Sequence, residues 1–230
     1  MRYFVVLGLI VCLCASAHAQ ETLLGAGLRS RPAYDGSAEQ EADLVPVIRY
    51  YGSRWFARTT QGILEAGARH ELDTNFWAGV QLAYEPEGAD AAGVDAGLSA
   101  GLHLEWDRHI GRVPVNFLIR ARQHLDADLG GQADLRVTAG VFARGGFLAG
   151  AFGQATWGTR NAVASRYGPR NAGLLYDSIG LLGSYDLGRR WRLVGSVERR
   201  QLRDEVAESA LAERTANYYA SAGIAYRFAR

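Results

Sequence analysis

The feature that most constrains this chain is the two-residue alternation of its last segment, from Asn217 to Phe228. One face of the segment carries tyrosine, alanine, isoleucine and phenylalanine, while the other face is mixed and carries mostly polar or small residues. Because the side chains of a β-strand alternate between its two faces, this pattern predicts a strand with one apolar face. Its length suits a tilted strand that crosses a bilayer, which takes about 9–11 residues.

The alternation recurs along the chain and is clearest between Val94 and Trp106, where apolar residues alternate with Asp95, Ser99 and Glu105. Repeated segments of about 10 residues with one apolar and one polar face are typical of transmembrane barrels. We therefore expect an all-β fold, a transmembrane antiparallel up-and-down β-barrel of about 12 strands, with about 10 as the second possible count. A soluble β-sandwich and a periplasmic barrel are the competing folds. The expected strands are 23–31, 43–51, 54–60, 62–70, 75–84, 94–106, 113–125, 132–143, 146–157, 174–186, 190–202 and 217–228.

Two of these strands are less well defined than the rest. The boundary near Thr60 to Gly62 has little sequence signal, and the strand at 174–186 carries leucine or isoleucine on both faces. With both termini on the periplasmic side, short turns and long outer loops must alternate. The expected outer loops are 32–42, 85–93, 126–131, 158–173 and 203–216.

Aromatic residues gather at the expected strand ends. Trp and Tyr prefer the interface between membrane and water, so barrels carry aromatic girdles at both rims. The expected periplasmic girdle contains Tyr50, Tyr51, Trp55, Phe56, Phe76, Trp77, Trp106, Phe142, Phe147, Tyr185, Trp191, Tyr226 and Phe228. The expected outer girdle contains Tyr84, Trp157, Tyr176 and Tyr218.

The first residues predict a secretory signal peptide, residues 1–19. Arg2 gives the charged start, the apolar run extends from Tyr3 to Cys14, and Ala17 to Ala19 form a cleavage site. The apolar run is too short for a spanning helix, which needs about 20 apolar residues. Both cysteines of the chain lie inside this segment, so we expect the barrel domain, residues 20–230, to contain neither a disulfide nor a thiolate site.

Charge gives a second constraint. The formal net charge is +1, and all the basic residues are arginine, which argues against a nucleic-acid-binding surface. An arginine that faces lipid at the bilayer midplane costs about 2–4 kcal/mol, so the charges of the strands are expected to face the lumen. The expected lumen set is Arg29, Arg49, Arg58, Arg69, Arg120, Arg122, Arg136, Arg192 and Arg200 with Glu65, Asp95, Glu105, Asp134 and Glu198. It predicts either a salt-bridged plug that stiffens a narrow barrel or an anion-favouring pore.

A set of short motifs, in this order, resembles a known family. The motifs are Gly25 to Gly27, Arg31 to Ser37, Leu44 to Ile48, Tyr167-Gly168, Tyr185 to Leu187 with Trp191, and Gly223 to Phe228. Together they resemble the MltA-interacting protein family, also called MipA/OmpV, over essentially the whole mature chain. The resemblance implies an outer-membrane barrel that acts as a scaffold for a lytic murein transglycosylase and a bifunctional penicillin-binding protein. The chain departs from the family pattern by adding Ala229-Arg230 after the terminal Phe, which puts recognition by the assembly machinery in question, and by its arginine-rich middle.

Three segments contain residues of the types that form sites. Gly97 to Gly101 matches the G-x-S-x-G nucleophile elbow, but no helix follows it, so small residues that pack a lumen are the favoured interpretation. His124 to Asp128 offers imidazole and carboxylate ligands for a divalent cation, but a solvated loop start is favoured. Arg160, Arg166 and Arg170 lie in an outer loop and suit lipopolysaccharide phosphates, since arginine pairs bidentately with phosphate.

These observations predict a non-enzymatic outer-membrane scaffold, without catalytic residues, metal or cofactor and with unknown binding residues. The expected partners are outer-membrane lipid and lipopolysaccharide, a lytic transglycosylase and a penicillin-binding protein, but no nucleic acid. The alternative function is a small-solute channel that favours anions. A hydrolase or acyltransferase built on Ser99 is the third hypothesis.

Overall fold

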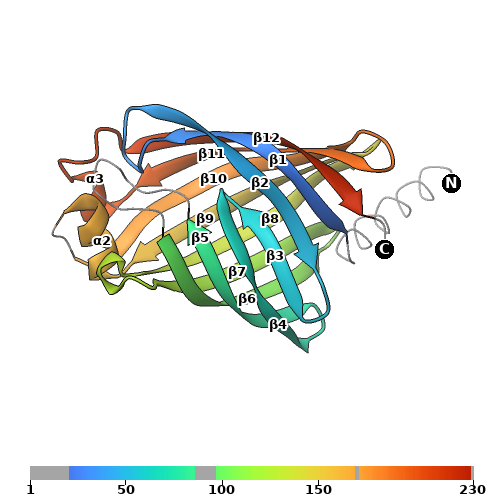
Figure 1. The fold of residues 1–230 in the computed structure, drawn as a ribbon, viewed down its shortest axis with the longest axis horizontal. Helices are drawn as coiled ribbons and strands as arrows, with labels where there is room; N and C mark the ends of the chain where they lie inside the picture. The colour runs from blue at the N-terminus through green and yellow to red at the C-terminus, as the bar shows by residue number, and fades with distance from the viewer. Residues whose placement is uncertain (1–20, 86–96, 169–170, 229–230) are drawn as a thin grey trace.

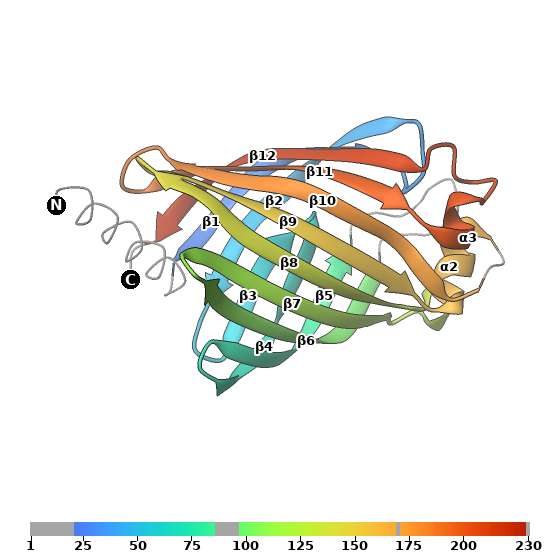
Figure 2. The ribbon, with the colours of Figure 1, turned by 180° about the vertical axis from the view of Figure 1, so that it is seen from behind.

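The computed structural model of the protein describes residues 21–85, 97–168 and 171–228, which form a closed antiparallel barrel of 12 strands (Figures 1 and 2). Each strand pairs with its neighbours in sequence, and β1 pairs with β12 to close the barrel. The predicted fold class and strand count are therefore confirmed. The strands are β1 (Thr22–Pro32), β2 (Gln40–Tyr51), β3 (Trp55–Thr60), β4 (Ile63–Asp73), β5 (Phe76–Glu85), β6 (Gly97–Ile110), β7 (Val113–His124), β8 (Gly131–Arg144), β9 (Phe147–Gly158), β10 (Gly173–Asp186), β11 (Trp191–Leu202) and β12 (Ala216–Phe228).

Short helical segments accompany the strands: the 3-10 helix η2 (Ala127–Leu129) and the helices α2 (Arg160–Tyr167) and α3 (Asp204–Ala207). Within the described ranges, no helix has the length and apolar character that a membrane crossing requires. The predicted signal peptide, the predicted outer loop at 85–93 beyond its first residue, Asp95, Arg170 and the Ala229-Arg230 extension lie outside the described residues.

The two rims of the barrel differ. Strand β1 begins and strand β12 ends at the same rim, where Thr22 lies opposite Phe228. This rim, called the turn rim, carries the short connections at 52–54, 74–75, 111–112, 145–146 and 187–190. The opposite rim, called the loop rim, carries α2 and α3 (Figure 1) and the longer connections among the described residues, apart from the tight turn Gln61-Gly62. Among the described connections, the predicted alternation of short and long connections is confirmed with that exception.

The outer face of the barrel is apolar, and its inner face is charged. Leu28, Leu102 and Ile179 point outward and are 63%, 62% and 63% exposed. Glu65 and Arg120 point inward and are 0% and 1% exposed. A soluble protein shows the opposite arrangement, because water is the better solvent for charges. In lipid, a closed barrel is the one strand-based structure that satisfies every backbone amide, so these strands span a membrane.

Part of the expected aromatic girdle is present. The exposed rings at the turn rim are Trp55, Trp106, Phe142, Phe147, Tyr185, Trp191 and Phe228, and those at the loop rim are Tyr84, Trp157 and Tyr218. Four further members point into the lumen, so their assignment to the girdles was wrong. They are Tyr51, Phe56, Trp77 and Tyr176.

The reason for these errors is the strand geometry itself. Two aromatic residues that are adjacent in one strand must point to opposite faces, so in the pairs Tyr50-Tyr51 and Phe76-Trp77 one ring turns inward. Inside the barrel, the ring of Trp77 lies 4.1 Å from the guanidinium carbon of Arg69. Tyr176 belongs to the strand whose two faces looked alike, and it is only 9% exposed.

The seam between β1 and β12 is reinforced by an ion cluster at the turn rim. Arg192 contacts Glu21 at 2.6 Å and Asp186 at 2.7 Å. Arg227 contacts Glu21 at 2.9 Å and also donates to Asp186. This cluster, called the seam cluster, joins the residue before β1 to strands β10, β11 and β12.

The predicted outer loop at 158–173 contains helix α2, which the alternation did not indicate. The Thr159 hydroxyl caps the helix by accepting a hydrogen bond from the Ala162 amide at 3.5 Å, and it accepts a second from the Gly131 amide at 2.9 Å. A helix this short is not stable alone, so tertiary packing must hold it. That packing lies over the mouth of the barrel.

Candidate functional site

The middle of the lumen is filled by buried ion pairs. Glu65 on β4 accepts a hydrogen bond from Arg58 Nε at 2.6 Å and one from Arg120 Nη1 at 2.6 Å. Arg120 also donates from Nε to Asp134 at 2.8 Å. All four side chains are at most 7% exposed. Because β4 is separated from β7 by two intervening strands, the Glu65–Arg120 pair reaches across the inner wall rather than along one hairpin.

The network extends toward both rims. On the side of the turn rim, Arg58 contacts Glu105 at 3.2 Å, and the Asn116 amide donates to Glu105 and to Asp107 at 2.9 Å each. On the side of the loop rim, Arg122 contacts Glu85 at 2.5 Å. These side chains form a plug across the lumen, as the first of the two sequence-based interpretations predicted.

The expected lumen set is placed as predicted wherever it is described. Arg29, Arg58, Arg120, Arg122, Arg136, Arg192, Arg200, Glu65, Glu105, Asp134 and Glu198 are buried inside the barrel. Arg49 lies opposite Arg58 in the β2–β3 register, and Arg69 lies over the inward rings of Tyr51 and Trp77. The pattern of alternation indicated their direction but not which partner each would meet.

The connection between β1 and β2 folds into the mouth at the loop rim. Asp35 at its centre accepts hydrogen bonds from Arg200 Nη1 at 2.9 and 2.7 Å and from the Tyr219 hydroxyl. Asn217 holds the same connection through the Gly36 amide at 2.8 Å and the Ser37 carbonyl at 2.9 Å. Burial opposes ionisation of Asp35, but Arg200 and the Tyr219 hydroxyl outweigh it and hold the pKa of the carboxyl below its ordinary value.

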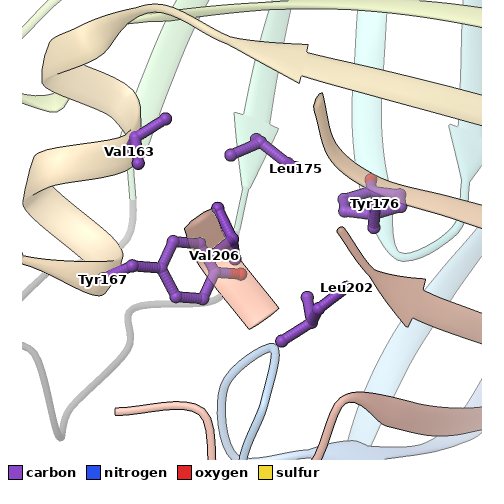
Figure 3. Close-up of a cluster of buried hydrophobic side chains, with 6 residues drawn as sticks. All are labelled: Val163, Tyr167, Leu175, Tyr176, Leu202 and Val206. Atoms are coloured by element: carbon purple, nitrogen blue, oxygen red, sulfur yellow. The ribbon is translucent and has the colours of Figure 1, made fainter. Parts of the chain in front are cut away.

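A hydrophobic cluster closes the mouth beside this connection. Figure 3 shows Val163 and Tyr167 of α2 turned toward Val206 of α3 and the strand residues around it. The remaining members of the cluster are Leu175, Tyr176 and Leu202. Burial raises the pKa of Tyr167 well above its ordinary value, and the nearby charge of Asp35 adds to the effect. We call the cluster and the Asp35 connection together the outer cap.

A cavity of about 90 Å³ lies between the plug and the outer cap. The alternation predicted that the strand residues of the cavity wall point inward. The sequence did not predict the cavity itself or the presence of Asp35 and Arg166 in its wall. Its wall also includes Asp35 and Glu85. The basic residues of the wall are Arg29, Arg120, Arg122, Arg166 and Arg200.

The G-x-S-x-G segment does not form a nucleophile elbow. Ser99 lies inside strand β6, is 0% exposed, and is not followed by a helix. Its neighbour across the strand pair is His124 on β7. The small residues Gly97, Ser99 and Gly101 therefore line the lumen side of β6, as the favoured interpretation predicted, while Leu98 faces outward.

The segment His124 to Asp128 divides between the lumen and the loop rim. The His124 ring is 5% exposed, and its Nε2 lies 3.3 Å from Arg166 Nη2. Asp126 caps η2 by accepting a hydrogen bond from the Asp128 amide at 3.0 Å. In the part of the chain that the structure describes, no three His, Cys, Asp or Glu side chains converge to hold a metal ion.

Two of the arginines proposed for lipopolysaccharide, Arg160 and Arg166, do not share one surface. Arg160 is exposed at the start of α2, whereas Arg166 lines the cavity and donates to the Ala162 carbonyl at 3.3 Å. A single phosphate-binding patch that contains both side chains is therefore not formed.

Several known proteins are similar to this chain in sequence or in fold. The family described as "MltA-interacting protein MipA" matches residues 24–228, and no curated protein matches. An outer-membrane channel from Pseudomonas putida F1 is 11% identical, with a TM-score of 0.56 over 91% of this chain and 96% of that chain. The NanC porin is 13% identical, with a TM-score of 0.53 over 90% of this chain and 100% of that chain.

At these identities the structural likeness shows the fold alone. The neighbours are an outer-membrane channel and a porin, and the closed barrel with its apolar exterior places this protein in the outer membrane. The family match spans nearly all the described residues and confirms the resemblance found in the motifs. The chain belongs to the MltA-interacting protein MipA family.

Proposed function

We propose that this protein is a non-enzymatic scaffold of the outer membrane that binds murein-remodelling enzymes at its turn rim. The observation that carries the proposal is membership in a family whose description names an interaction with MltA. The proposed partners are a lytic transglycosylase and a penicillin-binding protein. The plug supports a role other than transport, because the ion pairs of Arg120 with Glu65 and Asp134 are buried in the middle of the lumen.

The surface of the turn rim suits a protein partner. In outer-membrane barrels the short turns face the periplasm, where murein is remodelled. The exposed arginines on or beside these turns are Arg54, Arg112, Arg144, Arg189 and Arg190. Between them, Leu72, Ile110 and Leu187 are 56%, 63% and 47% exposed. Arginine is enriched and apolar side chains are central in protein interfaces, so this rim favours a partner with an acidic surface.

The test is co-purification in detergent of the barrel with a lytic transglycosylase and a penicillin-binding protein from the same organism. We expect both to be enriched over an unrelated barrel. The double variant Arg112→Glu and Arg189→Glu should lose the enrichment, whereas Arg160→Glu at the loop rim should keep it. Equal recovery by the unrelated barrel would refute the scaffold.

The second candidate function is a small-solute channel that favours anions. The observation in its favour is the arginine-rich wall of the cavity, since rings of arginine favour anions in pores. Conductance across a planar bilayer separates the two functions. Anion-selective current would support the channel, and a silent barrel would exclude it.

Lipopolysaccharide is a proposed lipid partner at the loop rim. The exposed side chain of Arg160 is the described residue best placed to meet its phosphates. Lipopolysaccharide binding should weaken in Arg160→Ala, and unchanged binding would contradict this contact.

The non-enzymatic character is part of the proposal and rests on the burial of Ser99 in the lumen wall. Lipase activity of the purified barrel that disappears in Ser99→Ala would overturn it.

A further inference from the structure

The outer wall of the barrel carries an apolar groove across strands β9 to β12, which lie side by side in Figure 2. We propose that this groove seats an acyl chain of lipid A, the membrane anchor of lipopolysaccharide, while Arg199 binds a phosphate of the same lipid. The inference rests on the lipopolysaccharide partnership proposed above and gives it a second site. It is independent of the scaffold function, which concerns the opposite rim.

The strand register explains why the groove exists. One row of paired residues across β9 to β12 sends no side chain to the outer surface, and it consists of Phe152, Gly180, Glu198 and Tyr219. The three side chains of this row are 5–6% exposed, because they point into the lumen. On the outer surface the row therefore presents only backbone, which forms the floor of the groove.

Two outward-facing rows form the walls of the groove. The row nearer the loop rim contains Ile179, Arg199 and Tyr218. The row nearer the turn rim contains Leu181, Val197 and Ala220. The groove encloses about 680 Å³, which lies within the range of about 300–1,000 Å³ that ligand pockets occupy. It is therefore large enough to hold part of a lipid.

Arg199 lies at the level of the lipid headgroups. Its side chain is exposed, it stands near the end of β11 at Leu202, and its register partner is Tyr218 of the aromatic girdle at the loop rim. Aromatic girdles mark the interface between membrane and water, and the longer loops of outer-membrane barrels face the outside. The outer leaflet at this level is built from lipopolysaccharide, so lipid A is the lipid that this wall meets.

The guanidinium group of Arg199 can pair with a phosphate. It donates to Gln201 Oε1 at 2.7 Å, which is an uncharged acceptor nearer the loop rim. Asp177, the register partner of Gln201 on β10, is ion-paired with Arg203 instead. A long basic side chain at a membrane surface turns its charge toward the headgroups, and arginine pairs bidentately with phosphate. Arg199 thus places positive charge beside one wall of the apolar groove.

The groove and the charge together match one amphipathic ligand. A soluble phosphate would pair with Arg199 but leave the groove empty, and a neutral chain would do the reverse. The groove runs across the strands, and the strands of such barrels are tilted by about 35–45°. The groove is therefore inclined to the membrane plane, as an acyl chain that descends from its phosphate requires.

The experiment is native mass spectrometry of the full-length barrel in detergent, titrated with three lipids. These are lipid A with both phosphates, lipid A without phosphates, and phosphatidylglycerol. We expect phosphorylated lipid A to bind most tightly, and Arg199→Gln should weaken its binding about tenfold. The matched control is Arg108→Gln, an exposed arginine beside Trp106 at the turn rim, which should bind lipid A as the wild type does.

A second pair of variants tests the groove. Ala220→Leu fills the groove with an apolar side chain that is compatible with lipid, so it should weaken lipid A binding. Ala222→Leu adds the same side chain on the same face of β12 but outside the groove, so it should leave binding unchanged. The heat-dependent gel shift of each variant establishes that the barrel has folded.

Four outcomes would overturn the proposal. Equal binding of lipid A without phosphates, or equal weakening by Arg108→Gln, would exclude the phosphate contact. Phosphatidylglycerol bound as tightly as lipid A would exclude the assignment to lipopolysaccharide. Equal effects of Ala220→Leu and Ala222→Leu would exclude the groove.

The same titration separates this site from the functions proposed above. Weakening by Arg160→Ala with no effect of Arg199→Gln would support the contact at α2 and overturn the groove site. Absence of lipid A binding to the folded wild type would overturn both lipid contacts. The scaffold function is measured independently, by the enrichment of murein-remodelling enzymes.

Discussion

Replacing Glu65 by glutamine removes one negative charge from between two buried guanidinium groups. Glu65 Oε2 accepts from Arg58 at 2.6 Å, and Oε1 accepts from Arg120 at 2.6 Å. Glutamine keeps one carbonyl oxygen, which can still accept a hydrogen bond from one arginine. Its amide nitrogen can only donate, and it would face the guanidinium group of the second arginine, which also only donates. The three side chains are at most 7% exposed, so water cannot compensate for the lost carboxylate.

The expected loss of stability follows from this geometry. A hydrogen bond to a charged group contributes about 1.5–3 kcal/mol, and removing one partner of a buried ion pair costs about 3–5 kcal/mol. We therefore expect Glu65→Gln to lower the free energy of unfolding by about 3–5 kcal/mol. The measurement is reversible urea unfolding of the barrel in lipid vesicles, followed by tryptophan fluorescence.

The matched control is Glu41→Gln at the loop rim. Glu41 contacts Arg31 at 3.0 Å, but its side chain is 41% exposed and Arg31 keeps Asp43 as a second partner. An exposed ion pair contributes about 0–1 kcal/mol, so this variant should unfold almost as the wild type does. The argument for a tightly packed plug would be wrong if both variants lost the same small amount.

Three further perturbations test the cap and the exterior. The folded-state pKa of Asp35 is below its ordinary value of about 4. The ionised carboxylate therefore stabilises the folded barrel fully above about pH 4, and this stabilisation is lost as the pH falls through the folded-state pKa. Asp35→Asn should therefore cost about 1–3 kcal/mol at neutral pH, and the difference from wild type in urea unfolding should shrink below about pH 4. Thr159→Ala removes the N-cap of α2 and should cost about 1 kcal/mol, seen as faster amide hydrogen exchange in α2 with unchanged exchange in β11. Leu181 faces lipid and is 55% exposed, so Leu181→Arg should cost about 2–4 kcal/mol in vesicles, whereas a neutral result would contradict the membrane-facing assignment of β10.

Much of the barrel was predictable because a period of two is a strong signal in a closed sheet. Each strand has one face toward lipid and one toward the lumen, so the direction of Arg120 or Glu65 follows from its position in the alternation. The directions of Tyr51, Phe56 and Trp77 were missed because position near a turn was given more weight than the alternation. The direction of Tyr176 was missed because the strand at 174–186 carries apolar residues on both faces.

The outer cap and the cavity were not predictable in the same way. Asp35 meets Arg200 across 165 positions of sequence, and Asn217 meets Ser37 across 180. No local pattern encodes such partners, because they depend on how the finished barrel brings its loops together. Helix α2 was missed for a related reason, since its packing against α3 and β10 supplies the stability that its short length lacks.

The seam cluster has a consequence for assembly. Every strand pair except this one joins neighbours in sequence, but β1 and β12 bring together residues as distant as Thr22 and Phe228. The entropy lost on closing so long a loop makes this pairing the last that we expect to form during insertion. Before β1 and β12 pair and Glu21 contacts Arg192 and Arg227, the sheet has two unpaired edges. Unpaired edges can form hydrogen bonds with strands of other chains. We therefore expect the ion pairs of the seam cluster to stabilise the strand pair that forms last.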